Sequence, residues 1–229
     1  MGYYYGYYVI FGIFMLISWL VGYQLKRKFK EYSKIQLRIG LTGRDIAEKM
    51  LHESNIFDVS IVSVPGQLSD HYNPLNKTIN LSKEVYEGRS VASAAVAAHE
   101  CGHAVQHATA YSFLRLRSAL VPIVSFSSNI IQWVLLAGIL LINTFPSLLL
   151  FGIILFATTT LFSFITLPVE FDASRRALVW INNSGFTSGE EQAKATNALK
   201  WAASTYVVAA LASLATLLYY IWIFMGRRN

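Results

Sequence analysis

The stretch ASAAVAAHECGHAVQHA, residues 92–108, decides most of what can be read from this chain. Its many alanines predict a helix, and Ser90 is placed to cap the first turn. Within that helix His99 and His103 are four residues apart, so both imidazoles lie on one face. With Glu100 between them, this is the HExxH pattern that binds zinc through two histidines and keeps a glutamate beside the metal-bound water. Because so short a pattern also arises by chance, the rest of the sequence must support a metallohydrolase.

The composition indicates a membrane protein. Of the 229 residues, 54% are hydrophobic and only 14% are charged, which is too apolar for an ordinary soluble domain. The net charge of +6 comes from basic residues beside apolar runs, which favours contact with lipid head groups and argues against nucleic-acid binding. The single cysteine, Cys101, excludes an internal disulfide.

Four apolar stretches are long enough to cross the roughly 30 Å hydrocarbon core of a bilayer, which takes about 20 helical residues. They are residues 3–23, 120–142, 147–167 and 204–225. Only the turn-forming segment 143–146 separates the second stretch from the third, so these two are expected to form a tight helical hairpin. The predicted fold is a mostly α membrane protein with about four transmembrane helices, a polar zinc-binding region and a small β-sheet.

The distribution of basic residues predicts the orientation. Nearly every Lys and Arg falls in the polar segments 26–119 and 168–203, which four crossings place on one side, and the positive-inside rule makes that side the cytoplasm. Arg227 and Arg228 would then lie outside the cell, which contradicts the positive-inside rule. For this reason a buried or interfacial helix is the alternative for residues 204–225. The predicted parts are an N-terminal transmembrane anchor (1–25), a cytoplasmic region with the HExxH helix (26–119), a transmembrane hairpin (120–167), cytoplasmic helices (168–203) and a C-terminal transmembrane helix (204–229).

The segment before the HExxH helix has signals for one short helix and two strands. Thr42 is suited to cap a helix over residues 43–51. Residues 59–64 alternate apolar and polar side chains, and residues 77–81 form a second short strand after a polar loop over residues 68–76. If the strands pair, an exposed edge can bind an extended peptide; a hairpin that only covers the metal helix is an equal alternative.

A catalytic zinc site needs three protein ligands and one open position, so a third ligand must come from elsewhere in the chain. Glu170 is the candidate, because it follows the third apolar stretch on the same predicted side as the HExxH helix. Pro168 indicates a new helix start with Glu170 and Asp172 in the first turn. Acidic residues are also common in a first turn without any metal, because they interact favourably with the positive end of the helix dipole. Asp172 is the alternative ligand, since only one of two residues spaced this way can face the metal.

Two other histidines are given lesser roles. In a continuous helix His107 lies about 11 Å along the axis from His99, too far to share one ion, so it is expected to support the site or to be structural. His71 lies in the polar loop, where it either contacts substrate by donating to a developing oxyanion or simply faces solvent.

Several motifs together resemble the bacterial YugP-like family of membrane-embedded neutral zinc metallopeptidases, over nearly the whole chain. The matching segments are SDHYNP (69–74), INLS (79–82), VAAHECGHAVQ (96–106) and PVEFDAS (168–174). The chain is also similar, more distantly, to HtpX-like and CAAX prenyl proteases, in which an HExxH helix and a glutamate in an E-F/Y-x-A-D segment bind zinc. Glu170, Phe171 and Ala173 match that segment, whereas Ser174 replaces its aspartate and Asp172 is the available substitute.

The resemblance implies a gluzincin-type enzyme in the cytoplasmic region. With the motif, it predicts a membrane zinc metalloprotease in which His99, His103 and Glu170 hold Zn²⁺ and Glu100 is the general base for zinc-activated water. The expected substrate is a peptide or membrane protein at the cell membrane, in quality control or processing. The competing hypothesis is a non-enzymatic, zinc-stabilised scaffold or partner-binding protein. Glu100 argues against it, because a purely structural zinc site does not need a general base. A transporter would need charges inside the apolar stretches, which contain essentially none.

Overall fold

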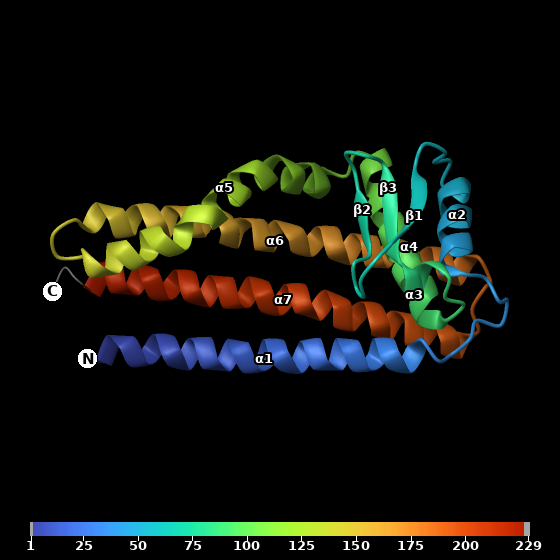
Figure 1. The fold of residues 1–229 in the computed structure, drawn as a ribbon, viewed down its shortest axis with the longest axis horizontal. Helices are drawn as coiled ribbons and strands as arrows, with labels where there is room; N and C mark the ends of the chain where they lie inside the picture. The colour runs from blue at the N-terminus through green and yellow to red at the C-terminus, as the bar shows by residue number, and fades with distance from the viewer. Residues whose placement is uncertain (1, 227–229) are drawn as a thin grey trace. The chain divides into compact units, whose positions relative to one another are not determined.

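The computed structural model describes residues 2–226, so Arg227 and Arg228, which bear on the last crossing, lie outside the described residues. The elements in chain order (Figure 1) are α1 (Gly2–Tyr32), α2 (Gly43–Glu53), β1 (Ser60–Val64), β2 (His71–Asn73), β3 (Thr78–Ser82), α3 (Lys83–Tyr86), α4 (Val91–Ala108), α5 (Ser112–Leu140), α6 (Pro146–Asn183) and α7 (Gly189–Gly226). They form two compact units. Of the described residues, the first contains 2–20, Leu116–Leu167 and 205–226; the second contains Val21–Arg115 and Pro168–Ser204.

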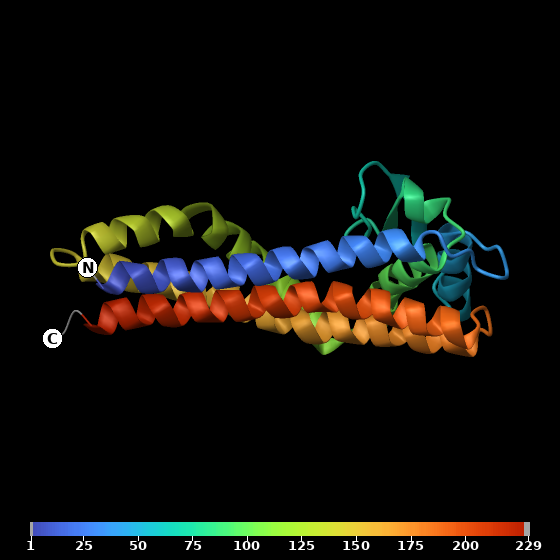
Figure 2. The same cartoon turned by 90° about the horizontal axis from the view of Figure 1, so that it is seen from below.

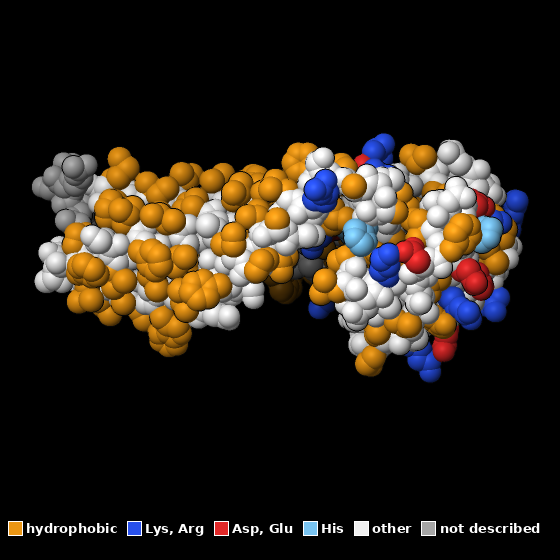
Figure 3. Space-filling model, turned by 90° about the horizontal axis from the view of Figure 1, so that it is seen from above, with side chains coloured by type: hydrophobic (Ala, Val, Ile, Leu, Met, Phe, Trp, Pro, Cys, Tyr) orange, Lys and Arg blue, Asp and Glu red, His pale blue; other side chains and the backbone are white. Residues whose placement is uncertain are grey.

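The first unit is built from long apolar helices. Within residues 2–226, α1, α5, α6 and α7 are each long and apolar enough to cross a membrane, as the four apolar stretches predicted. The ribbons of α1 (blue) and α7 (red) are unbroken in Figure 2. On the face drawn in Figure 3, hydrophobic side chains predominate on this unit, whereas charged side chains gather on the second unit. Large apolar surfaces of this kind are stable in lipid and costly in water.

The hairpin of α5 and α6 is confirmed. α5 ends at Leu140 and α6 begins at Pro146, so the connection is short. Leu135 and Leu149 are buried where the two helices meet. A Cβ atom on Gly138 would lie 2.6 Å from the Cα atom of Leu149, which means that the two backbones are in contact. Glycine at such a contact is the usual way in which helices approach closely inside a membrane.

The second unit contains a small mixed sheet with β3 at its centre. β1 pairs with β3 in parallel, and β2 pairs with the other side of β3 in the antiparallel sense, so the strand order is β1-β3-β2. The two predicted strands are therefore confirmed as β1 and β3, and they do pair. The prediction of a loop throughout residues 68–76 was wrong, because His71–Asn73 form β2.

Long-range pairing, and not local sequence pattern, makes β2 a strand. Three polar or aromatic residues are too few to show an alternating pattern. Their position is fixed by β3 and by Asp70, whose carboxylate accepts hydrogen bonds from the backbone N–H of Ser82 at 2.7 Å and from its hydroxyl at 3.1 Å. Burial raises the pKa of Asp70, although the Ser82 hydrogen bonds oppose this shift.

Local capping signals set the helix starts in this unit. Thr42 and Asp45 exchange hydrogen bonds at the start of α2, where each side chain accepts from the backbone N–H of the other residue. Ser90 caps α4 by accepting from the backbone N–H of Ser93 at 3.2 Å. Both caps were predicted, and each satisfies backbone donors that a helix leaves without partners in its first turn.

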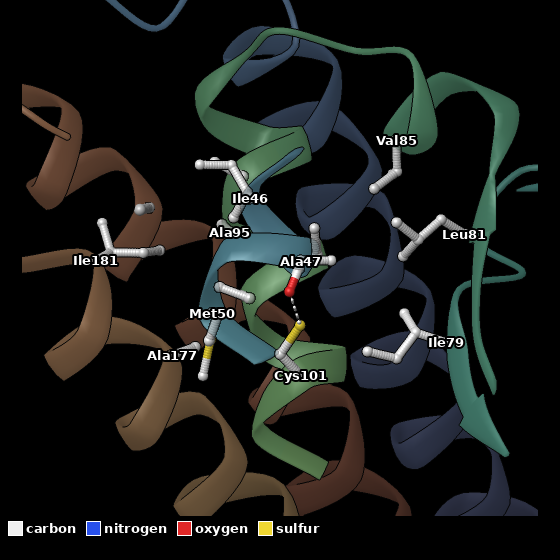
Figure 4. Packing of buried hydrophobic residues seen from close by; sticks show 14 of the residues in the cluster. Ile46, Ala47, Met50, Ile79, Leu81, Val85, Ala95, Cys101, Ala177 and Ile181 are labelled. Atoms are coloured by element: carbon white, nitrogen blue, oxygen red, sulfur yellow. Dashed lines mark hydrogen bonds between the residues drawn. The ribbon is translucent and has the colours of Figure 1, made fainter. Parts of the chain in front are cut away.

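The core of the second unit surrounds α4 (Figure 4). α2, β3 and α6 all contribute buried apolar side chains to it. The labelled members are Ile46, Ala47, Met50, Ile79, Leu81, Val85, Ala95, Cys101, Ala177 and Ile181. The thiol of Cys101 is completely buried there and donates a hydrogen bond to the carbonyl oxygen of Ala47 at 3.5 Å. The face of α4 that carries Cys101 is thus part of the structural core.

Pro168 does not begin a helix, and this prediction was wrong. α6 runs without interruption from Pro146 to Asn183, so Glu170 and Asp172 lie well inside it and not in a first turn. A proline inside a helix removes one hydrogen bond and costs about 3 kcal/mol or more. Burial of Ile165 and Val169 on either side stabilises the helix against that cost. α6 therefore carries the predicted third ligand on a rigid helical segment.

α4 and α6 approach each other very closely at Gly102. A Cβ atom at this position would lie 2.5 Å from the carbonyl oxygen of Ala173 and 3.0 Å from its Cα atom. Ala173 is completely buried, so its backbone has little room to move. The absence of a side chain at Gly102 thus sets the distance between the two helices.

We predict that Gly102→Ala will destabilise the protein. The added methyl group must displace backbone atoms of α6, and overpacking of this kind costs about 1–3 kcal/mol. The apparent melting temperature of the detergent-solubilised protein should fall by several degrees. Gly189→Ala is the control, because a Cβ atom there has nothing within 4 Å. An equal melting temperature for Gly102→Ala and the unsubstituted protein would show that the helices can separate freely.

Candidate metal centre

α4 presents its two predicted zinc ligands side by side. His99 and His103 are one turn apart, with ring centroids 4.8 Å apart and planes at 85°. Alanine and glycine dominate the buried part of the helix around them, so other structural elements can pack closely against it. His103 is buried and His99 is partly buried, and both belong to the second unit.

α6 supplies the third predicted ligand. The Oε2 atom of Glu170 lies 3.3 Å from Nε2 of His99 and 3.6 Å from Nε2 of His103. Within residues 2–226, His99, His103 and Glu170 form the group of potential metal ligands, with all three ligand atoms within 4.8 Å of one another. The alternative ligand, Asp172, is outside this group. Its carboxylate contacts Arg175 at 2.5 Å and Arg176 at 2.6 Å.

The other ring nitrogen of each histidine is held by a neutral side chain. Nδ1 of His99 lies 3.1 Å from the hydroxyl oxygen of Ser174, one turn after Glu170 on α6. Nδ1 of His103 lies 3.1 Å from the side-chain oxygen of Gln106. When Nδ1 donates to such a partner, Nε2 carries a lone pair, and in both rings Nε2 is the atom that faces Glu170.

Sequence reasoning did not identify Gln106 as part of the site. This side chain is completely buried and contacts both helices. Its amide group donates to the backbone oxygen of Val169 at 2.8 Å and to Asp172 at 3.0 Å. The available signal was a polar residue three positions after His103, on the same side of an alanine-rich helix.

The donor set fits a zinc ion. Two imidazole nitrogens and one carboxylate oxygen, converging from two helices, are a common protein share of a catalytic zinc site. Burial lowers the pKa of His103, but the hydrogen bond with Glu170 and the charge of Glu100 more than offset this, and the pKa is raised above its ordinary value. Metal ions and protons therefore compete for the same nitrogen.

The remaining predicted residues are not part of this group of ligands. Glu100 is buried in α4 with 7% of its surface exposed, next in sequence to His99. His107 is exposed, and its Nδ1 atom is hydrogen-bonded to the hydroxyl of Tyr72 on β2 at 2.7 Å. His71 is exposed on β2, with Nδ1 donating to the backbone oxygen of Ser69 at 2.8 Å. The contact with Tyr72 was not predicted, because it joins residues 35 positions apart.

Comparison with known proteins agrees with this site. Residues 7–225 match the protein family described as "Putative neutral zinc metallopeptidase". The chain is 40% identical over 213 residues to a Bacillus subtilis (strain 168) protein named "Putative membrane protease YugP", and the alignment covers 93% of this chain and 94% of that protein. No solved structure matches the chain. Since the family match spans nearly the full length and includes all three clustered side chains, the chain belongs to this family of neutral zinc metallopeptidases and is a membrane protein.

Proposed function

We propose that this protein is a gluzincin-type membrane protease that hydrolyses peptide bonds, with a zinc ion held by His99, His103 and Glu170. The observation that carries the proposal is the convergence of both Nε2 atoms on Oε2 of Glu170. Three ligands from two helices leave a position open for water, which a catalytic site requires and a structural zinc site lacks.

In the proposed reaction Glu100 is the general base. When bound, zinc supplies positive charge that polarises water and a peptide carbonyl and lowers the pKa of the water. Glu100 takes a proton from the attacking water and delivers it to the leaving amine. Ser174 and Gln106 hold the two imidazoles in place during this proton transfer. The burial of Glu100 limits competition from bulk water.

The proposed substrate is a peptide segment or a membrane protein, and the proposed role is quality control or processing. A peptide held for cleavage is commonly bound in extended form along the edge of a sheet. β1 and β2 are the edge strands, and β2 is tied to α4 through Tyr72 and His107. This link makes β2 the favoured edge in the proposal.

Glu100→Gln should abolish proteolysis and leave zinc binding intact. The substitution keeps the size of the side chain and removes the base, and general-base catalysis contributes about 10²–10⁴-fold in rate. The measurement compares membrane-protein fragments, by mass spectrometry, in cells with the unsubstituted protein and with the variant. Glu48→Gln, at an exposed position of α2, is the matched control. An unchanged fragment pattern in Glu100→Gln would favour a zinc-stabilised scaffold.

Glu170→Gln should lower the zinc content of the purified protein. An amide oxygen is a much weaker ligand for zinc than a carboxylate, so the content should fall well below the expected value of about one ion per chain. Elemental analysis of the detergent-solubilised protein gives the result directly. Glu190→Gln, in the exposed first turn of α7, should retain zinc. Equal zinc content in the two variants would transfer the ligand role to another group, with Asp172 the first to test.

The proposed orientation places the second unit in the cytoplasm. Leu75→Cys, at a residue that is 92% exposed, should react with an impermeant thiol reagent only after the membrane is opened. Asn143→Cys, in the exposed turn between α5 and α6, should react in intact cells. The native Cys101 is buried and gives little background. The opposite labelling pattern would reverse the orientation.

A further inference from the structure

We infer that Gln106 is a positioning residue for the metal centre, which sets both the ring orientation and the proton position of His103. The inference rests on the proposed function, since it concerns how one zinc ligand is prepared for the metal. It is carried by the hydrogen bonds of a completely buried amide that joins α4 to α6.

The surroundings allow the Gln106 amide only one orientation. Its nitrogen faces two acceptors, the backbone oxygen of Val169 at 2.8 Å and a carboxylate oxygen of Asp172 at 3.0 Å. A flipped amide would place its oxygen against both acceptors and lose these two hydrogen bonds, which is strongly unfavourable for a completely buried group. The amide oxygen therefore faces His103.

This orientation determines which nitrogen of His103 carries the proton. An amide oxygen only accepts, so Nδ1 of His103 must be the donor across their distance of 3.1 Å. In the neutral ring Nε2 is then unprotonated and faces Glu170 at 3.6 Å. Gln106 thus prepares the nitrogen that a metal requires, and the ring cannot rotate away without breaking this hydrogen bond.

Gln106 transmits position without transmitting charge. Asp172 is the carboxylate behind it, and both of its oxygens are held by guanidinium groups, from Arg175 at 2.5 Å and Arg176 at 2.6 Å. A carboxylate placed directly on His103 would add negative charge to the metal centre and weaken its pull on electrons. The Gln106 amide is held in place by Asp172, and it separates the negative charge of Asp172 from the His103 ring.

The test measures zinc affinity, because a purely structural glutamine would leave it unchanged. Gln106→Met keeps the approximate length of the side chain and removes all three hydrogen bonds, so the dissociation constant for zinc should rise about 10- to 100-fold in competition with a chromogenic chelator. Gln192→Met is the matched control. That partly buried glutamine also donates to a backbone oxygen of α6, that of Leu178 at 3.1 Å, but it touches none of the three ligands. Its dissociation constant should stay within about twofold of the unsubstituted value.

A second pair of variants decides the matter even if Gln106→Met fails to fold. Gln106→Glu keeps an acceptor for His103 but sets one carboxylate against Asp172, so zinc binding should weaken. Adding Asp172→Asn supplies a donor to the new carboxylate and should recover most of the lost affinity.

Unchanged affinity in Gln106→Met, an equal loss in Gln192→Met, or no recovery in the double variant would each overturn the inference. An unsubstituted protein that binds no zinc would instead overturn the proposed function, before any glutamine variant is compared.

Discussion

The contact between the backbones of α4 and α6 is the constraint on which the rest of the site depends. Gly102 lets α4 lie against the carbonyl of Ala173, and the potential metal ligands of the two helices converge in the same region. Each helix contributes side chains one turn apart, the histidines on α4 and Glu170 with Ser174 on α6. A larger residue at Gly102 or Ala173 would move the histidines of α4 away from Glu170 and Ser174 of α6, because helices are rigid over such lengths.

Much of this arrangement could be predicted from local sequence patterns. The capping residues Thr42 and Ser90, the hairpin between α5 and α6 and the two strands that alternate in polarity all follow from short-range chemistry. The grouping of His99 with His103 follows from helical spacing alone. Pairing these histidines with Glu170 also required the predicted membrane topology. Only the number of membrane crossings places the Glu170 segment on the same side of the membrane as the HExxH helix.

The features that were missed depend on contacts between distant residues. β2 exists because β3 is beside it, and its three residues carry no pattern of their own. Pro168 has a strong local preference for a helix start, and burial of its neighbours overrides that preference. Gln106 acts through Val169 and Asp172, which are more than 60 positions away. Spacing along the chain contains no information about such partners, whereas packing of α4 on α6 defines them.

The buried position of Cys101 has a consequence for the chemical environments in which the protein can work. Although it lies within the HExxH segment, its thiol faces the core and bonds to Ala47, and burial raises its pKa well above the ordinary value. Peroxide and alkylating agents attack the thiolate, which is scarce and shielded here. Oxidants and alkylating agents that inactivate thiol-dependent enzymes are therefore expected to react slowly at this sulfur.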